Sequence, residues 1–300
     1  MNANPTFREK DYPGLYQAAD AESIRTQQIY FRGLRWFLIL LILGALINFF
    51  AGDSKIFALM SAGAFISSLF LSVFIAVRRD DRNWYSARAV AESVKTRSWR
   101  YMMRTEPYQN GSGEARNCFL ADLKEILEEN INVTKRLDNE SAVRDLISGP
   151  MEEIRALAMQ DRLTFYIKHR VEEQRDWYQR KAKANRRDEI RWFIFIVGLN
   201  SLAIICVLLR IAFTNWSSLP SGVFAVAAAS LVCWLQAKRF SELTTSYVLT
   251  THEITIIKAG VPTIYREEEL SHFVSDTENA FSREHTQWAA RRDTRCRTAT

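Results

Sequence analysis

The chain has 300 residues, of which 48% are hydrophobic and 25% are charged, and its formal net charge is +6. This charge is modest and no nucleic-acid-binding motif accompanies it, which argues against a nucleic-acid partner. The four cysteines have no paired spacing, so the sequence predicts neither a disulfide framework nor a zinc site.

The first predicted elements are two apolar stretches, residues 36–51 and 56–77, with a very short turn between them. Neither contains Asp, Glu, Lys or His. About 20 apolar residues in a helix span the ~30 Å hydrocarbon layer of a bilayer, so the second stretch is long enough and the first is marginal. The polar segment before them lacks the pattern of a cleaved signal peptide. We therefore expect a membrane-spanning hairpin.

Amphipathic helices are predicted after this hairpin. In residues 84–101 the apolar and aromatic positions recur at a spacing of three to four, which predicts a helix that extends the second span. Shorter helices are expected at about residues 119–127 and 137–147.

A second pair of apolar stretches, residues 192–213 and 219–237, repeats the first arrangement. Its one charge, Arg210, lies near the end of a stretch, from which the side chain could reach water. Buried hairpins in a large soluble domain are the alternative interpretation. Uncharged stretches of this length, with Arg191 and Trp192 where a membrane interface would lie, favour the bilayer.

The helical pattern continues on both sides of the second hairpin. An amphipathic helix from about residue 161 is expected to run straight into the third span, and the fourth span is expected to continue to about residue 258. Residues 252–258 are rich in β-favouring Ile and Thr, so a short strand there is the minority alternative. Two short helices, 267–274 and 276–291, are expected to close the chain.

The two halves of the chain look like copies of one plan. Each hairpin opens on Arg-Trp-Phe, at residues 35–37 and 191–193. The second helix of each hairpin also carries small residues at every fourth position: Ala64, Ser68, Ser72 and Ala76 in the first, and Ser221, Ala225, Ala229 and Cys233 in the second. Such stripes let membrane helices pack closely, within a hairpin or in an assembly. Gly149 and Pro150 form a helix-start signal, and we place the boundary between two modules there, 1–149 and 150–300.

The expected fold is all-α and integral to the membrane, with four transmembrane helices arranged as two duplicated hairpins and long cytoplasmic helical extensions. The turns within the hairpins hold few basic residues, whereas the N-terminal segment, the centre and the tail hold most of them. Lys and Arg favour the cytoplasmic side of a membrane. We therefore expect a multi-pass inner-membrane protein with both termini in the cytoplasm.

No catalytic or metal-binding constellation is evident in the sequence. His252-Glu253 resembles the start of a zinc-protease motif, but position 256 is Ile rather than the second His that this motif needs. We therefore expect no catalytic residues, no metal, no cofactor and no enzyme activity.

Polar residues inside the apolar stretches are few, and the candidates of interest are Asn48, Ser68, Ser72 and Asn200. Such residues can form hydrogen bonds between helices or line a water path. Because the stretches hold no carboxylate, His or Lys, the sequence argues against a pump or a secondary transporter.

The amphipathic segments carry patterns that resemble the SLATT family. Trp84, Arg88, Glu92, Lys95 and Trp99 resemble one SLATT subtype. Arg170, Gln174, Trp177 and Tyr178 are similar to a second subtype, as are Glu278, Glu284, His285 and Trp288 in the tail. The resemblance covers about residues 8–291.

SLATT modules are two-span membrane domains that are associated with nucleotidyltransferases and sensor domains in bacterial conflict systems. The resemblance implies a homo-oligomeric effector in the lipid bilayer that opens a gated pore when a nucleotide second messenger or a sensor protein reports infection. A membrane scaffold that recruits a cytoplasmic partner and never conducts is the alternative.

Overall fold

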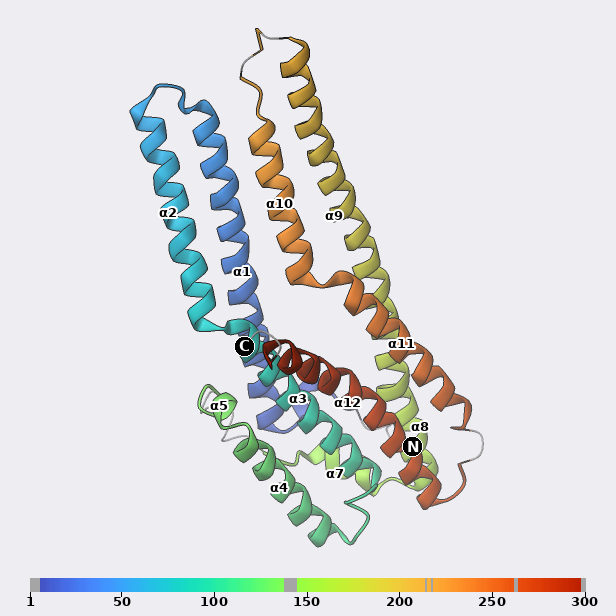
Figure 1. The fold of residues 1–300 in the computed structure, drawn as a ribbon. Coiled ribbons are helices and arrows are strands. Elements are labelled where there is room, and N and C mark those ends of the chain that lie inside the picture. The colour runs from blue at the N-terminus through green and yellow to red at the C-terminus, as the bar shows by residue number, and fades with distance from the viewer. Residues whose placement is uncertain (1–5, 138–144, 214, 217, 262–263, 298–300) are drawn as a thin grey trace. The chain divides into compact units, whose positions relative to one another are not determined.

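The computed structural model describes residues 6–137, 145–213, 215–216, 218–261 and 264–297, with side chains described up to residue 282. Every regular element in these ranges is helical (Figure 1), which confirms the all-α prediction. The chain divides into two compact units. The span unit comprises Gln27–Asp80 and Lys181–Thr245, and the polar unit comprises Met1–Thr26, Asp81–Arg180 and Ser246–Thr300.

The span unit contains two helical hairpins (Figure 1). Helices α1 (Gly14–Ala51) and α2 (Lys55–Arg78) form the first, and α9 (Glu173–Ala212) and α10 (Ser221–Lys238) form the second. These four helices are long and apolar enough to cross a membrane, which confirms the predicted spans. A helix satisfies its backbone hydrogen bonds internally, as the bilayer interior requires. The apolar side chains are largely uncovered, and none in the most apolar window of the third span is buried.

Aromatic side chains connect the two hairpins at Phe31, near the middle of α1. The ring centroids of Phe31 and Trp234 lie 5.8 Å apart, and those of Trp192 and Trp234 lie 6.4 Å apart. The Lys238 ammonium lies 3.7 Å from the centroid of the Phe31 ring, close enough for a cation–π interaction. Tryptophan with an adjacent cation is typical of the membrane–water interface.

Each hairpin ends in a break that the sequence did not predict. We expected continuous helices past both second spans, but Arg79 and Arg239 adopt left-handed backbone conformations, with φ of 50° and 53°. Their N–H groups donate to the carbonyls of Ile75 and Leu235, which closes α2 and α10. Helices α3 and α11 start at the next residue. No strong sequence pattern predicts a non-glycine residue in the left-handed conformation, because the side chain disfavours that conformation.

Helices α1 and α2 pack through small residues. Ser61 is buried, and its hydroxyl donates a 2.9 Å hydrogen bond to the Gly44 carbonyl. Ser68, in the first small-residue stripe, is buried as well. On α10, by contrast, the exposed residues include three of the second stripe, Ala225, Ala229 and Cys233. These three residues of the second stripe therefore do not pack within the chain.

We expect Gly44→Val to destabilise the first hairpin, because even a Cβ at this position would lie 2.8 Å from the Phe65 ring. Overpacking of this kind costs about 1–3 kcal/mol. The matched control is Gly63→Val, since no atom lies within 4 Å of a Cβ built at Gly63. Thermal unfolding of the purified variants in detergent measures the difference. Equal melting temperatures for the two variants would contradict close packing at Gly44.

The polar unit is built from helices of both halves of the chain (Figure 1). They are the 3₁₀ turn η1 (Glu9–Asp11), α3 (Asp80–Met103), α4 (Ser112–Glu129), α5 (Ile131–Thr134), α7 (Gly149–Ala156), α8 (Met159–Tyr166), the π-helical segment η2 (Ile167–Glu172), α11 (Phe240–Ala259) and α12 (Glu267–Arg297), with the first turns of α1 and α9. Their large buried side chains form one core, which includes Trp99, Tyr101, Phe119, Met151, Ile154, Tyr166 and Ile254.

Several sequence predictions for this unit can be compared directly with the helices. The helix start at Gly149 and Pro150 is confirmed by α7, and residues 252–258 are helical in α11 rather than a strand. The two closing helices are wrong, since α12 is continuous from Glu267 to Arg297. Val274 and Thr277 are fully buried, so packing carries the helix across the predicted break. The helix expected at residues 137–147 lies mostly outside the described residues.

Two buried arginines hold the end of α3. Arg162 donates a 2.7 Å hydrogen bond to the carbonyl of Met103, the last residue of α3. Arg155 donates to the carbonyl of Tyr101 and, at 2.8 Å, to that of Tyr108. The last carbonyls of a helix have no partner within the helix, so these guanidinium groups replace the missing donors. The chain segments before and after residue 150 are thereby held in one unit.

Candidate ligand site in the polar unit

The centre of the polar unit is a buried ion pair between η2 and α12. The Nε and Nη2 atoms of Arg170 donate to the two carboxylate oxygens of Glu278 at 2.8 and 2.7 Å. Glu278 also accepts hydrogen bonds from the hydroxyls of Tyr166 and Thr96, each at 2.9 Å. The side chains of Arg170 and Glu278 are 1% and 0% exposed. Burial is the largest influence on the pKa of Arg170 and lowers it, but the charge and hydrogen bonds of Glu278, with smaller effects of Tyr12 and Glu92, together raise the pKa above its usual value.

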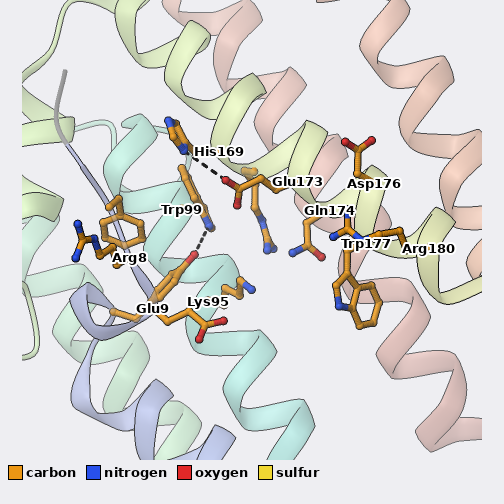
Figure 2. A pocket seen from close by; sticks show the side chains of 13 residues that line it. Arg8, Glu9, Lys95, Trp99, His169, Glu173, Gln174, Asp176, Trp177 and Arg180 are labelled. Atoms are coloured by element: carbon orange, nitrogen blue, oxygen red, sulfur yellow. Dashed lines mark hydrogen bonds and ion pairs between the residues drawn. The ribbon is translucent and has the colours of Figure 1, made fainter.

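A pocket of about 450 Å³ lies beside this pair (Figure 2). Its walls come from the segment that precedes α1, from α3, and from η2 with the start of α9. It is lined by Phe7, Arg8, Glu9, Tyr12, Lys95, Trp99, His169, Arg170, Glu173, Gln174, Asp176, Trp177 and Arg180. Figure 2 shows Lys95, Trp99 and Gln174 around one common space. Cations, carboxylates and aromatic rings are thus mixed in one cavity.

The acidic side chains Glu173 and Asp176 on one wall already have partners. The Nδ1 atom of His169 lies 3.5 Å from the carboxylate of Glu173, and Arg175 donates to Asp176 at 2.9 Å. On the opposite wall, the Trp99 indole N–H donates a 2.7 Å hydrogen bond to the Tyr12 hydroxyl. Burial raises the pKa of Tyr12 well above its usual value, so this hydroxyl stays neutral.

Two cationic groups of the pocket lack a full set of partners. The Lys95 ammonium lies 5.8 Å from the ring centroids of Tyr12 and Tyr16 and forms no ion pair within 4 Å with a described residue. Its nearest acidic neighbour along the helix, Glu92, is paired with Arg88 at 2.9 Å. Burial lowers the pKa of Lys95. The Nη1 atom of Arg170 is buried and has no hydrogen-bond partner among the described residues.

The structure brings together five of the residues singled out by the family resemblance. The residues at the pocket are Lys95 and Trp99 from the first pattern and Arg170, Gln174 and Trp177 from the second. Others lie outside it: Trp84 stacks on Tyr85 with ring centroids 4.3 Å apart, Arg88 pairs with Glu92, and Tyr178 contacts Trp177 and Tyr247. The side chains of Glu284, His285 and Trp288 lie outside the described residues.

Glu278 belongs to the tail pattern of the family resemblance but was not predicted to be a site residue. The signal that could have found it is Arg170 itself, because a guanidinium predicted on a packed helix face requires a buried carboxylate. Which of the many glutamates supplies it depends on folding, since Arg170 and Glu278 are far apart in the chain.

The polar candidates in the span unit are not brought together. Ser68 and Ser72 each donate a 2.8 Å hydrogen bond to a carbonyl of their own helix, Phe65 and Leu69. The Asn200 amide donates to the Ile196 carbonyl of its own helix at 2.9 Å and is exposed, as is Asn48. The hydroxyl that does join two helices belongs to Ser61. Among the described residues, no group of three or more His, Cys, Asp or Glu side chains could hold a metal ion.

Four apolar helices with a helical polar unit define a multi-pass helical membrane protein. Two family models match the chain, the SMODS and SLOG-associating 2TM effector domain 3 over residues 13–163 and the SMODS and SLOG-associating 2TM effector domain 1 over residues 166–288. The protein belongs to the SLATT family, with two such domains in tandem. No curated protein and no solved structure matches it. The exact module boundary at residues 149 and 150 stays a prediction.

Proposed function

We propose that this protein is the membrane effector of a bacterial conflict system, and that it oligomerises and opens a gated pore when its polar unit receives a signal. The effector class follows from the family, which is described as two-span effector domains. The observation that supports a pore is the uncovered surface of the spans, including a window of the third span in which no residue is buried. The exposed side chain of Asn200 interrupts that apolar surface.

An assembly of several chains is central to the proposal. Four helices are too few to enclose a wide channel, whereas copies packed through the exposed α10 stripe could surround one. Asn48 and Asn200 would then face water in the open assembly, because a polar amide is costly in contact with lipid tails. Ser68 and Ser72, which are bonded within α2, would contribute less.

The route of the signal follows from helix continuity. Residues of α1 and α9 belong to both units, and each helix is unbroken in the chain. The second helix of each hairpin is interrupted at Arg79 or Arg239. In our proposal α1 and α9 transmit a rearrangement of the polar unit to the spans. Changes in the backbone conformation of Arg79 and Arg239 accommodate this rearrangement in the second helix of each hairpin. The trigger is a nucleotide second messenger or a sensor protein that binds the open arrangement more tightly than the closed one.

The proposal includes a topology in which both termini and the central polar segment are cytoplasmic. In a variant without the four natural cysteines, a cysteine at Asp53 should react with an impermeant reagent added to intact cells, and one at Gly111 should react only after lysis. Labelling at both sites after lysis is the control for accessibility. Reaction of the Gly111 cysteine in intact cells would reverse the assignment.

The pore is tested in cells by overproduction, which raises the population of the assembled state by mass action. Membrane potential, dye exclusion and growth are recorded together. We expect depolarisation to begin before or with growth arrest. Arrest with the membrane potential and dye exclusion intact would rule out the pore. It would favour the second candidate, a non-conducting scaffold that recruits a cytoplasmic partner.

A further inference from the structure

We infer that the pocket between the segment preceding α1, α3 and the start of α9 binds a small phosphorylated molecule with an aromatic ring, of which a nucleotide is the class that fits. This inference deepens the proposed function, on which it rests, by assigning the place where the signal would act. Four steps support it.

The first step is the ammonium of Lys95. It lines the pocket and has no anionic partner within 4 Å among the described residues, since Glu92 is engaged by Arg88. Its closest favourable neighbours are two tyrosine rings with centroids 5.8 Å away. A partly buried cation that has no ion-pair partner within 4 Å, although the charges of Glu92 and Glu9 act on it from farther away, is stabilised when an anion arrives. The site therefore favours a negatively charged ligand.

The second step is the guanidinium of Arg170. Its bidentate contact with Glu278 fixes the orientation of the group, yet Nη1 has no hydrogen-bond partner. A buried donor without a partner is costly, and few native groups are left in that state. Arg170 is 1% exposed and lines the pocket, so a ligand oxygen can supply the missing acceptor. Arginine and lysine together form a typical phosphate-binding pair.

The third step is the aromatic wall. The ring centroids of Phe7 and Trp99 are 5.7 Å apart, and the indole N–H of Trp99 is already committed to Tyr12. Trp99 is 1% exposed and packs against Phe7, Phe165 and Tyr166, so the ring surface open to a flat group belongs to the partly buried Phe7. Trp177 lines the pocket as well. A ring beside a phosphate is the combination that a nucleotide presents, since bases stack on aromatic side chains.

The fourth step is size and position. A volume of about 450 Å³ falls within the range of small-molecule sites. The walls include the residues that lead into α1 and those that open α9. A ligand held between them would change the packing of the two helices that continue without a break into the apolar spans. The contacts of such a ligand would differ between the closed and the open arrangement, and this difference is what allows a trigger to shift the equilibrium.

The test is binding to the purified full-length protein in detergent, measured by isothermal titration and by thermal shift. The probes are ATP, GTP, cyclic AMP, cyclic di-AMP, adenosine and inorganic phosphate, each up to millimolar concentration. We expect at least one nucleotide to bind with a rise in melting temperature, and adenosine to bind at least about tenfold more weakly because it lacks the phosphate. Binding of inorganic phosphate as tight as that of every nucleotide would overturn the role of the ring. No binding by any nucleotide would overturn the inference as a whole.

Variants localise the binding. Lys95→Met should weaken nucleotide binding at least about tenfold, whereas Lys124→Met, on an exposed face of α4, should leave it unchanged. Phe7→Ala should weaken nucleotide binding but not phosphate binding. Equal nucleotide affinity in Lys95→Met and the unmodified protein would contradict this site. Because binding is measured without conduction, nucleotide binding without a pore would refute only the proposed function, and a pore without nucleotide binding would refute only this inference.

Discussion

Glu278→Gln should destabilise the protein by about 3–5 kcal/mol, because it leaves the buried guanidinium of Arg170 without a counter-charge. Both side chains are almost completely buried, and Arg170 donates two hydrogen bonds to the carboxylate. The expected result is a large fall in the melting temperature of the purified protein, or loss of the folded protein during purification.

Two comparisons make this result interpretable. Glu269→Gln removes a carboxylate from the exposed pair with Arg266 and should change the melting temperature little. The double variant Arg170→Met with Glu278→Gln should recover much of the loss, since no unpaired charge remains, the Gln oxygen can accept from Tyr166, and its amide N–H can donate to the Thr96 hydroxyl. A single Glu278→Gln variant as stable as Glu269→Gln would show that the pair does not hold the polar unit together.

Asn200→Leu should strongly reduce ion flux through the assembled protein while leaving it folded. Asn200 lies on the third span, is exposed and is bonded only to the Ile196 carbonyl of its own helix. Leucine is favourable in contact with lipid and has a high helix propensity, so the variant should fold at least as well as the unmodified protein. A lower flux would then reflect a lost polar lining rather than lost structure.

The control is Phe70→Leu on α2, an exposed apolar side chain that should face lipid in either arrangement. It should leave the flux unchanged. Equal flux in Asn200→Leu and Phe70→Leu, at equal amounts of assembled protein, would exclude Asn200 from the conducting path. The pore itself would then require another lining, with Asn48 the next candidate.

The apolar spans could be predicted from the sequence because their signal is local. Charge-free apolar stretches such as residues 56–77 need no knowledge of distant residues to be recognised as membrane helices. The helix start at Gly149 and Pro150 is local for the same reason, since its residues set the backbone conformation directly. The structure therefore confirms these features.

The helix breaks at Arg79 and Arg239 and the contact of Arg170 with Glu278 could not be predicted from the sequence, because a local pattern carries no information about distant residues. Arg79 and Arg239 adopt left-handed conformations where α2 and α10 end, although arginine itself disfavours that conformation. The continuity of α12 across Ser275 and Asp276 is likewise set by burial of its neighbours. The contact of Arg170 with Glu278 joins distant segments, so the family resemblance named both residues but their pairing depends on folding.

The most direct test of the central claim is dye and ion release from liposomes that contain the purified protein at rising protein-to-lipid ratios. Cross-linking of the same samples reports assembly, and parallel samples receive the nucleotide probes. Our account predicts that release appears with the cross-linked oligomer, rises more steeply than in proportion to protein, and falls in Asn200→Leu but not in Phe70→Leu. Oligomers that form in the bilayer and leave the liposomes sealed to dye and ions under all of these conditions would contradict it.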